Sequence, residues 1–107
     1  MNTSNPIQNL ESIDIVANRK DGGVDLAIVV SSVLMDTEEH QELLRRKIQN
    51  YTDHVFSESW KKEYGDAHVA IYLKAVTMPE QGIINLIAAI KKHLLDFDVD
   101  LFLEITE

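Results

Sequence analysis

The sequence contains no cysteine, only two prolines and four glycines, and few basic residues relative to acidic ones. Without cysteine there is no disulfide framework, no thiolate metal site and no cysteine nucleophile, and this usage fits a reducing compartment. Apolar runs such as residues 26–30 are far too short to span a bilayer. Residues 1–12 have neither the basic nor the apolar region of a secretory signal. We therefore expect a soluble cytoplasmic protein that does not bind membranes.

The charge balance is acidic, with 18 Asp and Glu residues against 10 Lys and Arg, which gives a formal net charge of −8. A phosphate backbone is repelled by such a field, and the electrostatic attraction that dominates non-specific nucleic-acid binding is missing. The same charge favours solubility and a basic protein partner. We expect no nucleic-acid partner.

The first part of the ordered chain reads as a β-hairpin. Residues 12–20 alternate, with Ile13 and Ile15 expected on the core side and Val16 on the other. The sequence Asp-Gly-Gly at 21–23 is typical of a turn, because glycine tolerates positive φ. In residues 24–33 the alternation resumes, and its apolar side is formed by Val24, Leu26, Ile28 and Val30.

Two helical patterns follow, each leading into a further strand. The first is expected to begin near Asp36 with Glu39 in a capping box, and its buried stripe is Leu44, Ile48, Tyr51 and Val55. It should end around residues 57–59, before a turn or short helix and a strand at 68–76. The second is expected to begin at Thr77, with Pro79 in its first turn and Glu80 three residues after the cap. The last strand covers residues 99–105, again with alternate apolar side chains.

The element order ββαβαβ predicts an α/β fold, specifically an α+β two-layer sandwich. A four-stranded mixed sheet carries both helices on one face, because crossover connections are right-handed in nearly all cases. We assign residues 1–11 to a flexible N-terminal tail and residues 12–107 to a single domain. One sheet face is left without a helix to cover it.

Two segments of the chain have a recognisable sequence pattern: EHQELLRRKIQNY at residues 39–51 and MPEQG at residues 78–82. The resemblance that they indicate extends from about residue 12 onward. The chain resembles a family of small bacterial proteins known only as a domain of unknown function. Its relatives often have Asp and Trp near the positions of Ser32 and Met35, so this chain departs from the family there. The resemblance implies a fold of this kind and no established activity. No catalytic residue is therefore carried over.

The uncovered sheet face is the first candidate site. By alternation it combines apolar and charged side chains, whereas a face open to water should be mostly polar. Exposed apolar patches of this kind tend to mark interaction surfaces. We expect a non-catalytic interaction module that forms a homodimer through this face or binds a basic protein partner. The expected contact residues are Val16, Val29, Tyr72, Lys74 and Phe102.

The alternative site is a pocket for a small enzyme or small-molecule binder at the start of the first helix. It would use Ser32, Asp36 and His40, because α/β folds often place ligands where a strand leads into a helix. His40 and His54 are 14 residues apart and cannot share a metal ion. No metal-binding, phosphate-binding or nucleophile motif is present, so we expect no metal and no cofactor, and an enzyme is the less favoured reading. Arg45 and Arg46 are expected to pair with Glu42 on a solvated helix face.

Overall fold

Four strands form one mixed sheet with neighbours in the order β1-β2-β3-β4. The computed structural model describes residues 15–105, so the predicted N-terminal tail and Ser12, Ile13 and Asp14 lie outside the described residues. β1 pairs antiparallel with β2, whereas the β2–β3 and β3–β4 pairs are parallel. The strands are β1 (Ile15–Asn18), β2 (Val24–Val30), β3 (Val69–Ala75) and β4 (Val99–Ile105).

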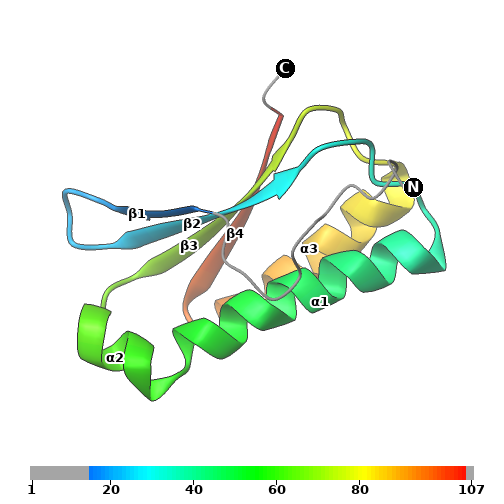
Figure 1. Ribbon diagram of the computed structural model, residues 1–107. Coiled ribbons are helices and arrows are strands. Elements are labelled where there is room, and N and C mark those ends of the chain that lie inside the picture. The colour runs from blue at the N-terminus through cyan, green and yellow to red at the C-terminus, as the bar shows by residue number, and fades with distance from the viewer. Residues whose placement is uncertain (1–14, 106–107) are drawn as a thin grey trace, which may run out of the picture.

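All three helices lie on one side of the sheet, and the other side has none (Figure 1). Two long helices, α1 (Glu38–Val55) and α3 (Gln81–Leu95), lie in the two crossover connections, and a short helix α2 (Glu58–Tyr64) comes after α1. The predicted two-layer sandwich with helices on one face is therefore confirmed. Within the described residues no helix combines the length and apolarity that crossing a membrane requires.

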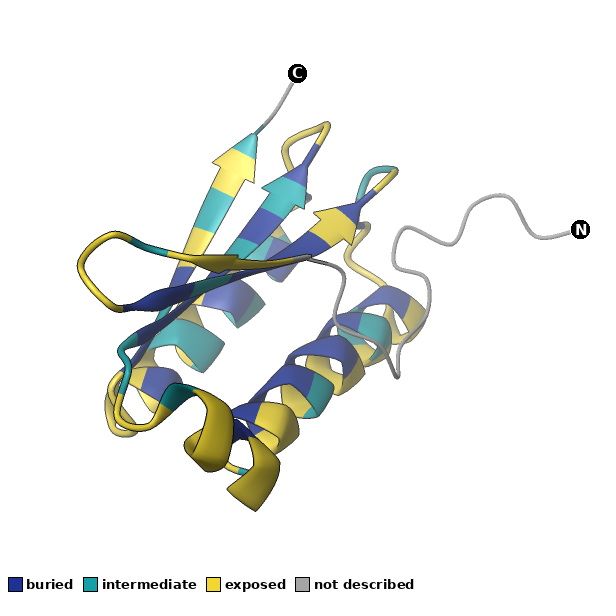
Figure 2. Cartoon of the chain, turned by 60° about the vertical axis from the view of Figure 1, so that its left-hand side comes forward, coloured by how far each residue is buried: buried dark blue, intermediate teal, exposed yellow. Residues whose placement is uncertain are grey.

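The core lies between the sheet and the helices. Leu26, Ile71 and Leu101 occupy one row across β2, β3 and β4 and are fully buried. Along β4, and along β3 from Ile71 onward, the more buried residues alternate with more exposed ones, as Figure 2 shows, whereas Ala70 is buried as well. Strands with this period present one apolar face. The alternation predicted for these three strands is thus correct.

The side chains of β1 point to the opposite sides of the sheet from those predicted. Val16 lies opposite Leu26 in the antiparallel register, and directly opposed residues point to the same side of a sheet. Val16 therefore belongs to the helix side, and its expected place on the open face is wrong. It is still 43% exposed, since β1 is an edge strand.

The connection between β1 and β2 fixes this register. Arg19 N donates to Gly23 O at 2.8 Å and Gly22 N donates to Arg19 O at 3.1 Å. Gly22 has a φ of 91°, which glycine adopts without strain. A Cβ on Gly23 would overlap the Arg19 guanidinium. The Asp-Gly-Gly segment therefore lies in the turn between the strands, as predicted. The whole connection is longer than this segment, because five residues separate β1 from β2.

The first helix begins two residues later than expected and with a different cap. Thr37 is the N-cap, and its hydroxyl accepts a hydrogen bond from His40 N at 3.1 Å. The Asp36–Glu39 capping box is therefore wrong, and an Asp36 carboxylate oxygen instead accepts from Gln41 Nε2 at 2.8 Å. The helix ends at Val55, and α2 follows with Ser57 as its N-cap. The expected break near residues 57–59 is confirmed.

The other long helix begins at Gln81, so the predicted start at Thr77 is wrong. The residue before a proline is disfavoured in helical conformation, so Met78, directly ahead of Pro79, is a poor first residue for a helix. Glu80 is the N-cap, but its carboxylate accepts from Asp36 N at 2.6 Å rather than capping its own helix. Its backbone N donates to Leu34 O at 3.0 Å. These bonds attach the α3 start to the loop before α1.

Candidate functional site

The open face of the sheet consists of three rows of side chains across β2, β3 and β4. The middle row places Ala27, Tyr72 and Phe102 side by side. Val29, Lys74 and Glu104 form the next row, and Asp25, Ala70 and Asp100 the row on the other side. The structure thus brings together four of the five residues expected on this face, and only Val16 is not among them.

The aromatic pair Tyr72–Phe102 forms the apolar centre of this face. The two ring centroids are 5.1 Å apart with planes tilted by 30°, a favourable arrangement for aromatic side chains. Phe102 is 39% exposed and Val29 is 45% exposed. Two large apolar side chains and part of Tyr72 are therefore in contact with water on one face.

Lys91 reaches this face from α3 around the edge strand β4. Its Nζ donates to Leu101 O at 2.7 Å and lies 4.4 Å from the centre of the Phe102 ring. A cation at this distance from an aromatic ring is attracted by the ring quadrupole. Lys91 therefore contacts the Phe102 ring and also binds the Leu101 carbonyl oxygen of the edge strand β4.

The other charged groups of the open face pair with one another. Lys74 Nζ is 3.5 Å from a Glu104 carboxylate oxygen. Arg19 Nε and Asp25 Oδ1, both inaccessible to solvent, face each other at 3.1 Å. With Asp100 and Lys91 included, three cations stand against three carboxylates. The face as a whole is close to neutral, although the chain is strongly acidic.

His68 links two of these charged groups at one end of the face. Arg19 Nη2 lies 2.8 Å from His68 Nδ1, and arginine can only donate, so Nδ1 carries no proton. The protonated Nε2 then donates to Asp100 at 3.0 Å. Both ring nitrogens of His68 are thus engaged, one with Arg19 and the other with Asp100. The imidazole links these two side chains at this end of the face.

A shallow hollow lies beside the aromatic pair. It has a volume of about 300 Å³, and its floor includes the small side chains of Ala17 and Ala27. Tyr72, Lys74 and Glu104 stand around it. A protruding aromatic ring next to a hollow gives the open face a shape that can complement a second protein surface.

The alternative site at the start of α1 has a structural explanation. His40 is only 5% exposed, and its Nδ1 accepts a hydrogen bond from Met35 N at 2.9 Å. Asp36 is exposed, and its carboxylate lies where a Cβ of Gly82 would be. None of Ser32, Asp36 and His40 lines the open-face hollow or the groove between the long helices. Their use as a ligand site stays a prediction, and His40 holds the loop before α1.

Replacing His40 with leucine is expected to lower the free energy of unfolding by about 1 kcal/mol, because the part-buried hydrogen bond from Met35 N to His40 Nδ1 would be lost. Chemical denaturation measures this. The matched control is His54→Leu, since His54 lies on the same helix but is exposed, and it should change stability by less than about 0.5 kcal/mol. Equal stability of His40→Leu and the unchanged protein would contradict this structural role.

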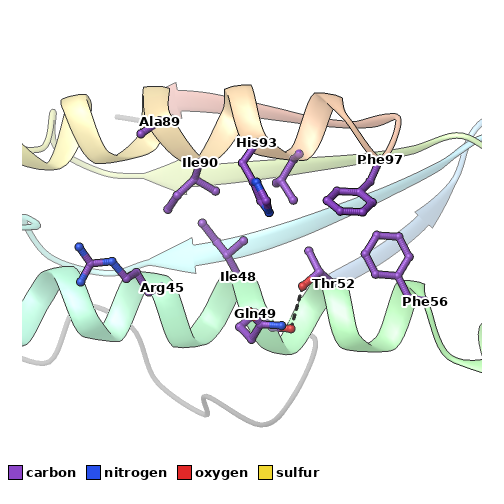
Figure 3. A pocket seen from close by; sticks show the side chains of 10 residues that line it. Arg45, Ile48, Gln49, Thr52, Phe56, Ala89, Ile90, His93 and Phe97 are labelled. Carbon is purple, nitrogen blue, oxygen red and sulfur yellow. Dashed lines mark hydrogen bonds between the residues drawn. The ribbon is translucent and has the colours of Figure 1, made fainter.

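A groove between α1 and α3 is a feature that the sequence patterns did not indicate. It has a volume of about 430 Å³ and is lined mainly by apolar side chains. Figure 3 shows side chains of both helices pointing into it. The lining residues are Arg45, Ile48, Gln49, Thr52, Phe56, Ala89, Ile90, His93, Leu94 and Phe97.

The cations of α1 do not pair as expected. Within residues 15–105, neither Arg45 nor Arg46 forms an ion pair with Glu42, so the predicted intrahelical pairs are wrong. Arg45 instead points along the groove (Figure 3).

Among the described residues, no group of three or more His, Cys, Asp or Glu side chains is placed to hold a metal ion.

Comparison with known proteins gives a family and no activity. Residues 5–107 match the model of a family of unknown function, DUF6572. The expected resemblance to a domain of unknown function is thereby confirmed. Neither curated proteins nor solved structures gave a match to this chain. Function therefore has to be argued from the surfaces of the molecule.

Proposed function

We propose that this chain, which belongs to the family of unknown function DUF6572, is a non-catalytic interaction module that self-associates through the open face of its sheet. The observation that carries the proposal is the exposed Tyr72–Phe102 pair at the centre of a face without helices. Removing apolar surface from water stabilises a complex by about 25 cal/mol per Å². Aromatic side chains near the centre of an interface supply much of the binding energy.

The charge distribution supports a second copy as the partner. A molecule with a net charge of −8 repels its own copy unless the contacting surfaces are neutral. The open face is balanced, whereas many exposed carboxylates lie on the helix side of the molecule. These are Glu38, Glu39, Glu42, Asp53, Glu58, Glu63, Asp66, Asp96 and Asp98. Face-to-face contact of two sheets keeps these carboxylates on the outside.

The pairing of charges within the face lowers the cost of covering it. An unpaired buried charge is strongly destabilising, but Lys74 and Arg19 already have carboxylate partners. A closed dimer brings the same patch of both copies together around a two-fold axis. In such an arrangement the Phe102 ring of one copy can fill the hollow over Ala27 of the other.

The molar mass in solution tests the proposal. Light scattering after size exclusion, at protein concentrations from ~1 μM to ~1 mM, covers the dissociation constants expected of specific interfaces. We expect the mass to rise from 12.2 kDa toward twice that value. We also expect the higher-mass form to persist at raised salt, because apolar contact is weakened little by screening. A mass of 12.2 kDa at every concentration would overturn self-association.

A further inference from the structure

We propose that the groove between α1 and α3 binds a small apolar carboxylate of the medium-chain fatty acid type. The carboxylate would lie at Arg45 and the hydrocarbon chain would run along Ile48, Ile90 and Leu94. This site is on the helix side of the sheet and is independent of the open face. Its volume of about 430 Å³ falls within the ~300–1,000 Å³ typical of small-molecule sites.

The apolar walls account for the hydrocarbon part of the ligand. Ile48 comes from α1 and Ile90 and Leu94 come from α3, so the groove is apolar on both sides. Phe56 and Phe97 close one end, with ring centroids 5.5 Å apart. Both rings are about half exposed, at 46% and 51%. An apolar chain along the groove would remove these surfaces from water, which is favourable in proportion to the area covered.

The polar groups of the groove account for the carboxylate. Gln49 and Thr52 are already engaged, since Thr52 Oγ1 donates to Gln49 O and Gln49 Nε2 donates to Asp53, both at 2.9 Å. In the part of the chain that the structure describes, the Arg45 guanidinium and the His93 ring nitrogens have no hydrogen-bond or ion-pair partner. The guanidinium fork matches a carboxylate in a bidentate arrangement.

The relative positions of these groups suit a ligand with one charged end. Arg45 lies on α1 and Phe56 is the C-cap of the same helix, eleven residues later, which corresponds to ~16 Å along the helix axis. Figure 3 shows Arg45 at one end of the groove, the two phenylalanines at the other and His93 between them. A single cation at one end favours a monoanion, and the acidic surface of the protein disfavours ligands with several negative charges.

Titration of the full chain with octanoate, followed by ¹H–¹⁵N NMR, tests this site. We expect shifts at Thr52, Ile90 and His93, which line the groove. Octan-1-ol, with the same chain and no charge, should bind at least about tenfold more weakly, as expected for loss of a charge-assisted hydrogen bond. Equal affinity for the alcohol, or no octanoate-induced shifts at these residues, would overturn the proposal.

Two variants locate the ligand and its charged end. Arg45→Gln should weaken octanoate binding about tenfold or more. The matched control Arg46→Gln removes the same charge one residue away, outside the groove, and should leave the affinity unchanged. Ala89→Phe places a ring in the groove from an exposed position and should abolish binding without disturbing the core. Equal effects of the two arginine variants, or unchanged binding by Ala89→Phe, would contradict the assigned site.

Discussion

Phe102→Asp is expected to convert the protein to a monomer at concentrations where the unchanged chain is dimeric. The substitution removes the most exposed aromatic ring of the open face and places a carboxylate near Glu104 and Asp100. Across a two-fold axis the new carboxylates of the two copies would also face each other. Loss of a central interface residue costs about 2 kcal/mol or more, which weakens dimerisation at least ~30-fold. Light scattering and sedimentation equilibrium measure this change.

Phe97→Asp is the matched control for that experiment. Phe97 is also an exposed phenylalanine, but it follows α3 on the helix side of the molecule. The same chemical change there should leave the mass of the dimer unaltered. Circular dichroism should show both variants folded, since both side chains are substantially exposed. A folded Phe102→Asp protein with the mass of the unchanged dimer would contradict the proposed interface, and so would dissociation by Phe97→Asp.

Tyr51→Ala is expected to lower the free energy of unfolding by about 3–5 kcal/mol, the range seen when a large buried aromatic side chain is truncated. Tyr51 is the largest fully buried side chain among the described residues. Its hydroxyl donates to Ala27 O at 2.5 Å and so joins α1 directly to β2. A domain of this size has a total stability of about 5–15 kcal/mol. The variant should therefore unfold at a much lower urea concentration.

Tyr51→Phe separates the hydroxyl from the ring. This variant keeps the packing and loses the bond to Ala27 O, and we expect a cost of about 1 kcal/mol. Tyr72→Phe is the control, because Tyr72 is half-buried on the other face of the sheet. A cost below about 1 kcal/mol for Tyr51→Ala would show that α1 is not held to the sheet at this position.

The sequence patterns predicted the strands well where each had enough apolar residues on one side. β2, β3 and β4 have seven residues each, and the buried row of Leu26, Ile71 and Leu101 follows from period two alone. β1 has only four described residues, with apolar side chains on both sides. Its register depends on the hydrogen bonds between Arg19 and Gly23, which the alternation does not specify.

The start of α3 was mispredicted because a local pattern competed with a distant partner. Thr77, Pro79 and Glu80 have the spacing of a helix start, but the Glu80 carboxylate binds Asp36 N, 44 residues earlier in the chain. His40 is a comparable case, since its partner Met35 N belongs to the loop before its own helix. Such bonds satisfy polar groups that the capping pattern assigns elsewhere.

The candidate sites differ in how far they could be foreseen. Four open-face residues, Val29, Tyr72, Lys74 and Phe102, follow from strand alternation, and the structure places them together. The groove depends on the distance between two helices that are separate in sequence, so no local pattern predicts it. Arg45 reads as an ordinary exposed helix residue until the facing wall of α3 is known.

The contact of Lys91 with the outermost strand has a consequence for how large an assembly can grow. A free strand edge is a template for adding further strands without limit, which leads to fibres and aggregates. Lys91 places a cation on the Leu101 carbonyl of β4 and makes addition of another strand there unfavourable. The same side chain leaves the Phe102 ring available on the flat side of the sheet. The lysine thus disfavours open-ended growth by strand addition at β4 and leaves the flat side of the sheet as the surface for the self-association proposed above.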